Sequence, residues 1–293
     1  MKQPKYETAE PFNFAGLSGQ TYEKAKVVVF PVPYSSTTYW NPNTKFGPQV
    51  LIEASRHMEL YDLELGCDIS SKLGVYTLDM LAPSKNSPLE MVGQVEKVVA
   101  QIIKDKKFMF MSGGEHSITL GAVKATSKKY RKLSVLYFDA HTDMRDAFEG
   151  TKYHHGTVAR RISELPVKLT HVGARSISEE EVLFFKKNPK ATTIFHAPEV
   201  PIQEIIDTLE ENVYISIDLD NLDPSIMPST GTPEPGGLSW EQETNLIREV
   251  GKQRNIVGFD IVEMSPIPGI PFPEFLAAKL AYKIMGYSLL KWK

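Results

Sequence analysis

The sequence contains one cysteine, Cys67, in 293 residues. A single thiol cannot form an intramolecular disulfide, so the fold does not depend on a disulfide framework, and we expect a reducing, cytoplasmic setting. No apolar run approaches the roughly 18 residues that a membrane-spanning helix requires. The first segment, Met1–Tyr22, also lacks the apolar region of a secretion signal. We therefore expect no membrane partner.

An excess of basic charge is also absent. The 33 lysine and arginine residues are outnumbered by 36 aspartate and glutamate residues, which gives a net charge of −3. The basic residues are scattered as short pairs, so the sequence does not indicate nucleic-acid binding. Hydrophobic residues make up 42% of the chain, which is enough for a sizeable core. We expect one large α/β domain over residues 1–293.

Apolar runs of strand length alternate with amphipathic segments along the chain. The expected strands are residues 26–31, 73–78, 108–111, 133–138, 169–173, 192–195, 213–217 and 256–262. The expected helices are residues 48–61, 89–104, 117–130, 157–164, a helix starting after Ser178, 202–211, 239–253 and 273–290. This alternation predicts an α/β fold with a parallel sheet that is covered on both faces.

Three potential metal ligands follow directly after the strand at residues 133–138. They are Asp139, His141 and Asp143, spaced two residues apart. If the backbone stays extended there, alternation of side chains places all three on the same side. The alternative is a turn in which Asp139 and Asp143 cap a helix and His141 lies on the surface.

Two further strands end in the same way. The run at 213–217 leads into Asp218 and Asp220, and the run at 108–111 leads through two glycines to His116. Carboxyl ends of parallel strands are where α/β proteins build their sites. Buried carboxylates repel one another unless they are paired or bound to metal. The pattern therefore favours a binuclear metal site.

Five segments together carry a family resemblance. They are Gly113-Gly114-Glu115-His116-Ser117 and residues 139–143, 216–224, 231–237 and 260–266. In this order they resemble the ureohydrolases, the family that includes arginase, agmatinase and guanidinobutyrase. The match runs from about Val27 to the C-terminus. It implies a three-layer α/β/α sandwich with an eight-stranded, mostly parallel sheet.

The resemblance implies two Mn²⁺ ions per chain, with a bridging hydroxide that attacks the guanidinium carbon. The implied ligands of one ion are His116, Asp139, Asp143 and Asp218. The implied ligands of the other ion are His141, Asp139, Asp218 and Asp220. Oxygen-rich ligation of this kind suits Mn²⁺ better than a structural zinc.

Three residues match catalytic positions of the family. Glu263 matches the carboxylate that orients the guanidinium group, and Asp143 can carry a proton to the leaving nitrogen. His155 matches a histidine that shuttles protons near the pocket mouth, for which histidine's ordinary pKa is suitable. The alternative for His155 and its neighbour His154 is a pair on a solvated loop.

The segment after the metal motif favours agmatine as the substrate, with putrescine and urea as products. Arginase has an asparagine where this chain has Arg145, whereas the surrounding residues are similar to those of microbial agmatinases. Arg145 could instead pair with a substrate carboxylate, as in guanidinobutyrate. Arginine and aminopropylagmatine also remain open, as does a non-catalytic metal-binding relative.

Two more expectations concern the surroundings of this site. The loop at residues 33–47 is long and aromatic, so we expect it to form a rim over the pocket. Within it, Tyr34, Tyr39 and Trp40 either line the mouth or pack. The resemblance also implies a homo-oligomer, a trimer or hexamer.

Overall fold

The computed structural model describes residues 6–7 and 9–290, so the ends of the predicted 1–293 domain and part of the Met1–Tyr22 segment lie outside the described residues. Eight strands form one sheet in the order β4-β1-β5-β10-β9-β6-β7-β8, and every neighbouring pair is parallel. The strands are β1 (Val27–Val32), β4 (Val75–Thr77), β5 (Phe108–Gly113), β6 (Leu133–Phe138), β7 (Lys168–Ala174), β8 (Thr193–His196), β9 (Asn212–Asp218) and β10 (Asn255–Val262). The predicted fold class is confirmed.

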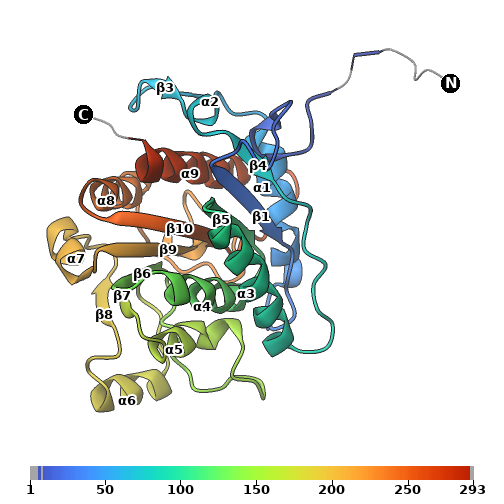
Figure 1. Ribbon diagram of the computed structural model, residues 1–293. Helices are drawn as coiled ribbons and strands as arrows, with labels where there is room; N and C mark the ends of the chain where they lie inside the picture. Colours follow the sequence, from blue (N-terminus) through green and yellow to red (C-terminus); the bar gives the residue numbers. More distant parts are fainter. Residues whose placement is uncertain (1–5, 8, 291–293) are drawn as a thin grey trace.

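Helices cover both faces of the sheet, which completes a three-layer sandwich (Figure 1). One face carries α1 (Gly47–Ser55), α7 (Ile202–Thr208), α8 (Trp240–Gln253) and α9 (Phe272–Leu289). The other face carries α3 (Pro88–Lys104), α4 (Thr119–Lys129), α5 (Val158–Ser163) and α6 (Glu179–Lys187). The short helices are α2 (Ile69–Leu73), η1 (Phe14–Gly16), η2 (Pro42–Phe46), η3 (His116–Ile118), η4 (His155–Thr157) and η5 (Leu219–Asn221).

Burial on both faces explains why the strands read as continuous apolar runs. In β6, Leu136 and Phe138 pack in one core, whereas Val135 and Tyr137 pack in the other. Every residue of β6 is buried. A sheet with one solvated face would instead show alternating polar residues. No described helix is long and apolar enough to span a membrane.

The helix expected at residues 48–61 is too long, because α1 ends at Ser55. Tyr61–Asp62 form a short strand, β2, that pairs antiparallel with β3, Cys67–Asp68. Gly66, with φ of 65°, supplies the left-handed residue in the turn between them. Residues 61–62 therefore form a hairpin strand and do not extend the helix. The hairpin places Cys67 in a half-buried strand.

The strand expected at residues 73–78 is also shorter than predicted. Leu73 ends α2, and Gly74 follows with φ of 65° before β4 begins at Val75.

Two predicted helix starts are confirmed. Ser178 caps α6 in a capping box with Glu181, and Ser239 caps α8.

The strand order decides where a site can form. The four adjacent strands β5, β10, β9 and β6 end at the same edge of the sheet. From β5 the order continues to β1 and β4, whereas from β6 it continues to β7 and β8. Such a change in direction opens a crevice at the carboxyl ends of the strands. The segments that follow these four strands carry the predicted site residues.

Candidate metal centre

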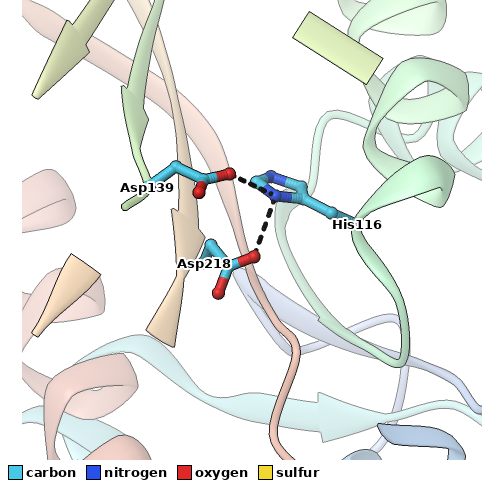
Figure 2. A group of neighbouring side chains, drawn as sticks. All are labelled: His116, Asp139 and Asp218. Carbon is cyan, nitrogen blue, oxygen red and sulfur yellow. Dashed lines mark ion pairs between the residues drawn. The ribbon is translucent and has the colours of Figure 1, made fainter. Parts of the chain in front are cut away.

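His116, Asp139 and Asp218 meet at the centre of this edge (Figure 2). His116 is the first residue of η3, whereas Asp139 follows β6 and Asp218 ends β9. The His116 Nδ1 atom lies 3.0 Å from Asp139 Oδ2 and 3.2 Å from Asp218 Oδ2. All three side chains are buried. One nitrogen and two carboxylate oxygens thus face one another closely enough to share an ion.

A second group of ligand atoms shares Asp139. His141 Nδ1 lies 2.9 Å from Asp220 Oδ2 and 3.6 Å from Asp139 Oδ1. The ligand atoms of Asp139, His141 and Asp220 lie within 4.8 Å of one another. The two oxygens of Asp139 therefore face different groups, as the oxygens of a carboxylate between two ions would.

Asp143 lies at the edge of the first group. Its Oδ2 atom is 3.7 Å from His116 Nδ1 and accepts a hydrogen bond of 2.7 Å from the Tyr137 hydroxyl. Its backbone is left-handed, with φ of 50°. No described helix begins between Asp139 and His154, so the alternative of a helix capped by Asp139 and Asp143 is wrong. The structure brings all six predicted ligands together.

The charges of this cluster are unbalanced without a cation. Burial and then the neighbouring charges of Asp220 and Asp139 raise the pKa of Asp218 well above its usual range. Burial alone would lower the pKa of His116, but the carboxylates of Asp139 and Asp218 outweigh it and raise that pKa. Asp139 Oδ2 accepts no hydrogen bond from the described residues. Buried acceptors that lack donors and repel one another fit divalent cations.

A buried chain of hydrogen bonds orients the His116 ring. Ser216 Oγ donates to Asp260 Oδ1 at 2.8 Å, and Tyr214 donates to Asp260 Oδ2 at 2.7 Å. Because the Ser216 proton is used there, His116 Nε2 must donate to Ser216 Oγ, 2.9 Å away. This arrangement leaves Nδ1 to face the carboxylates. Neither Asp260 nor Tyr214 was assigned a role from the sequence, although Asp260 begins one of the five segments that carry the resemblance and Tyr214 lies in an expected strand.

His171 is a third supporting residue. It is fully buried. Its Nε2 atom donates to the backbone carbonyl of Asp139 at 3.0 Å. The ring also packs edge-on against Tyr137. His171 therefore helps to fix the backbone of a residue that belongs to both ligand groups.

Glu263 and His155 lie next to the cluster. Glu263 follows β10 with φ of 64°, and its Oε1 atom accepts a hydrogen bond of 2.8 Å from the His116 amide. The same oxygen is 3.5 Å from His155 Nδ1. Burial lowers the pKa of His155, but the Glu263 carboxylate outweighs this effect and raises it. His155 is thus a partner of Glu263, which excludes the solvated-loop alternative for this residue.

The adjacent His154 has a local structural role. It is buried, and its Nδ1 atom accepts from the Gly156 amide in the cap of η4. Burial and then the charge of His155 lower its pKa to about 3, so the ring is neutral. Phe148 packs edge-on against it. His154 therefore supports the loop that carries His155.

Glu115 fastens the rim loop to the site. Its buried carboxylate accepts from the amides of Ser36 and Thr37 and from the hydroxyls of Thr37 and Ser117, at 2.5 to 2.7 Å. The Thr37 hydroxyl oxygen also accepts from the His155 amide at 3.1 Å. The loop at residues 33–47 is thereby joined to both the metal centre and η4.

A cavity of about 630 Å³ opens above the cluster. His141, Asp143 and Asp218 line its floor. Its walls include Tyr39, Trp40, Arg145, Phe148, Ile177 and Glu234. Of the three aromatic residues expected either to line the mouth or to pack, Tyr39 and Trp40 line the pocket. Tyr34 packs in the core. We refer to this cavity as the pocket.

Arg145 is held along the pocket wall by protein groups. Its guanidinium lies 4.7 Å from the centre of the Phe148 ring, and NH1 is 3.8 Å from Glu180 Oε2. The neighbouring Asp146 pairs with Arg161 and Lys152. The stacking and the nearby carboxylate offset part of the charge that Arg145 brings to the pocket.

Arg175 holds the backbone next to the pocket residue Glu234. Its guanidinium donates to six backbone carbonyls, those of Gly173, Asp220, Asn221, Leu222, Glu234 and Pro235. The shortest of these bonds, 2.6 Å, goes to Asp220. A planar guanidinium with five N–H donors suits such a set of acceptors. Arg175 therefore ties the Asp220 segment to the segment that carries Glu234.

Comparison with known proteins agrees with this architecture. The sequence signature described as the arginase family matches residues 25–286. An N(1)-aminopropylagmatine ureohydrolase of Synechocystis sp. is 38% identical over 299 residues, covering 98% of this chain and 97% of that protein. An agmatinase of Pyrococcus horikoshii is 34% identical over 268 residues, covering 90% and 92%. The solved structure of the agmatine ureohydrolase of Thermoplasma volcanium has a TM-score of 0.86 at 32% identity, covering 96% of this chain and 95% of that chain. The resemblance noted in the sequence is confirmed, and the chain belongs to the arginase family.

Proposed function

We propose that this protein is a manganese-dependent ureohydrolase that cleaves the guanidinium group of agmatine and releases putrescine and urea. The observation that carries the proposal is the position of Asp139, a buried carboxylate shared by two ligand groups, of which His141 and Asp218 line the pocket. Relatives named agmatinase support the substrate class.

Six residues would hold the two ions. The ligands proposed for one ion are His116, Asp139, Asp143 and Asp218. The ligands proposed for the other are His141, Asp139, Asp218 and Asp220. When bound, the ions supply Lewis-acid chemistry that activates water near neutral pH. Carboxylate and imidazole ligands suit Mn²⁺, and no thiolate is present in this set.

Glu263 is proposed to orient the substrate. A planar guanidinium pairs well with a carboxylate, and such pairs fix the angle of approach. The His116 amide holds Glu263 Oε1 at 2.8 Å, so the carboxylate is oriented before the substrate arrives. Placing the reacting carbon next to the ligand groups in this way contributes to catalysis by proximity.

Asp143 and His155 are proposed to move protons. Asp143 lies between the metal groups and the pocket, and Tyr137 holds its Oδ2 atom by a 2.7 Å hydrogen bond. From there it can pass a proton to the leaving nitrogen, which must be protonated to depart. His155 lines the same pocket and contacts Glu263, so it can exchange protons with solvent near the mouth.

The pocket wall favours a substrate with a cationic tail. Tyr39 and Trp40 are 57% and 75% exposed there, and aromatic faces attract ammonium groups. Glu234 adds a carboxylate, whereas Arg145 is already stacked on Phe148 and close to Glu180. A second candidate is aminopropylagmatine, which has a longer cationic tail. It is favoured by the 38% identity to the Synechocystis protein of that name.

The test is urea release after chelation and reloading with Mn²⁺. Agmatine, aminopropylagmatine, guanidinobutyrate and arginine are compared at equal concentrations. We expect the highest kcat/KM for agmatine. A preference for aminopropylagmatine would replace the substrate and keep the chemistry, whereas urea from none of the four would favour a non-catalytic metal-binding relative.

We also propose a homo-oligomer, a trimer or hexamer, as the resemblance implies. Light scattering at micromolar concentration measures the mass directly. A mass equal to the 32.9 kDa chain would contradict this proposal.

A further inference from the structure

Glu181 is a buried carboxylate in the pocket wall whose oxygens are both occupied. Its side chain is buried, although the residue lines the pocket. Oε1 accepts from the Thr142 hydroxyl and the Met144 amide, each at 2.7 Å. Oε2 accepts from the amide and hydroxyl of Ser178, at 2.9 and 2.7 Å. A carboxylate has about four acceptor positions, so these four donors leave none for a substrate ammonium.

The two groups held by Oε1 flank a proposed metal ligand. Thr142 and Met144 are the neighbours of Asp143, whose φ of 50° is unfavourable for a residue with a side chain. The Arg160 amide also donates to the Asp143 carbonyl at 3.0 Å. A strained conformation persists only when its surroundings hold it. The chain on both sides of Asp143 is held by one oxygen of Glu181.

The position of Glu181 in α6 explains how it reaches this loop. In an ordinary capping box the third residue of the helix binds only the start of its own helix. Here one oxygen does so through Ser178, and the other crosses to the loop at Thr142. The first turn of α6 and the metal loop are thereby joined through a single carboxylate.

We propose that Glu181 is a positioning residue that keeps Asp143 in its ligand conformation and so sets the affinity for the ion at the His116 group. This inference rests on the proposed metal-dependent function. It assigns Glu181 no contact with substrate, despite its place in the pocket wall.

Only a carboxylate can serve both ends. A glutamine at this position would accept at one end and present N–H groups at the other. In one orientation its amide nitrogen would face the Met144 N–H, and in the flipped orientation it would face the Ser178 N–H. In either orientation, therefore, an N–H group of the glutamine faces a backbone N–H group, and neither can accept a hydrogen bond. An amide of the same size cannot replace Glu181.

The test is Mn²⁺ binding, measured by titration calorimetry, in Glu181→Gln and in a control, Glu179→Gln. Glu179 is exposed in the same first turn of α6, so the control removes the same charge from the same helix end. We expect Glu181→Gln to bind one of the two ions 10- to 100-fold more weakly, the range typical for partners of metal ligands. Glu179→Gln should bind both ions like the wild type.

Kinetics separate positioning from substrate binding. Glu181→Gln should lower kcat for agmatine at moderate Mn²⁺, recover part of it at high Mn²⁺, and leave KM nearly unchanged. Unchanged Mn²⁺ affinities with a raised KM would overturn the inference and make Glu181 a substrate ligand. A wild type that binds no Mn²⁺ would refute the proposed function itself, which is a different result.

Thr142→Val gives a second test that leaves Glu181 in place. It removes one of the two donors to Glu181 Oε1, so Mn²⁺ binding should weaken about tenfold. If Glu181→Gln does not fold, as judged by its melting curve, Thr142→Val decides alone. Wild-type Mn²⁺ affinity in that variant would overturn the inference. Where both fold, their effects should not add, because they act on the same loop.

Discussion

Glu243 offers a test of the structure that is independent of catalysis. It lies on α8 with 1% of its surface exposed. Neither carboxylate oxygen has a hydrogen-bond partner within the described part of the chain. The side chain of Asn221 is close enough to lower the pKa of Glu243 by a smaller amount than burial raises it, and its Oδ1 is also buried and lacks a donor. Burial raises the pKa of Glu243 to about 8. We therefore predict that Glu243 is protonated in the folded protein at pH 7.

The sign of the pH dependence follows from this shift. The pKa of Glu243 rises from 4.5 to about 8 on folding, so between these values unfolding releases a proton. The free energy of unfolding therefore decreases as pH rises, and the contribution is lost as pH passes the folded-state pKa. With about 1.4 kcal/mol for each pKa unit, the loss between pH 6 and pH 8 is roughly 2 kcal/mol.

The assay is urea unfolding at pH 6, 7 and 8, with chelator present so that metal binding does not contribute. Glu243→Gln keeps the shape of the side chain, stays neutral and can donate to Asn221. The wild type should lose roughly 2 kcal/mol more than this variant over the range. Glu241→Gln, an exposed position on the same helix, is the control and should follow the wild type. Parallel pH profiles for the wild type and Glu243→Gln would refute the reasoning.

Three further predictions concern the site. Chelation should abolish urea release and Mn²⁺ should restore it, so a fully active metal-free preparation would contradict the proposal. Asp139→Asn and Asp218→Asn should be the most damaging variants, because each changes a proposed ligand of both ions. Arg145→Ala should leave agmatine turnover intact or improved. A wild-type preference for guanidinobutyrate that falls roughly ten- to a hundredfold in Arg145→Ala would instead show that Arg145 pairs with a substrate carboxylate. Arg175→Lys should lower thermal stability by at least about 2 kcal/mol, since an ammonium cannot donate to six carbonyls, and an unchanged melting curve would count against this.

The strands and the six candidate ligands could be picked out from the sequence because the signals for both are local. A buried strand in a covered sheet is a continuous apolar run, and a polar ligand at its end is visible in the next few residues. The supporting contacts depend on strand order instead. Asp260 reaches Ser216 only because β10 lies beside β9 in the sheet. Nothing in either segment alone indicates that pairing.

Glu115 and Glu181 show the same limit for loops. Glu115 precedes η3, and Glu181 forms a capping box with Ser178 at the start of α6. Their other contacts lie 78 and 39 residues away in the chain, at Thr37 and Thr142. Residue type predicts what a carboxylate can accept, but the partner is fixed by tertiary packing. These contacts could therefore be found only in the structure.

Backbone strain adds information that residue type conceals. Among the described residues other than glycine, six have positive φ, and two of these are Asp143 and Glu263. Glycine would adopt this conformation more easily but would supply no carboxylate. Each residue is instead held on more than one side. Asp143 is held by the Arg160 amide and the Glu181 contacts, and Glu263 by its own amide bonded to the Gly114 carbonyl and by the His116 amide. Both predicted catalytic carboxylates are thus held in a strained backbone conformation by the residues around them. Such strain costs stability, so we infer that these side chains are present for catalysis and not for folding.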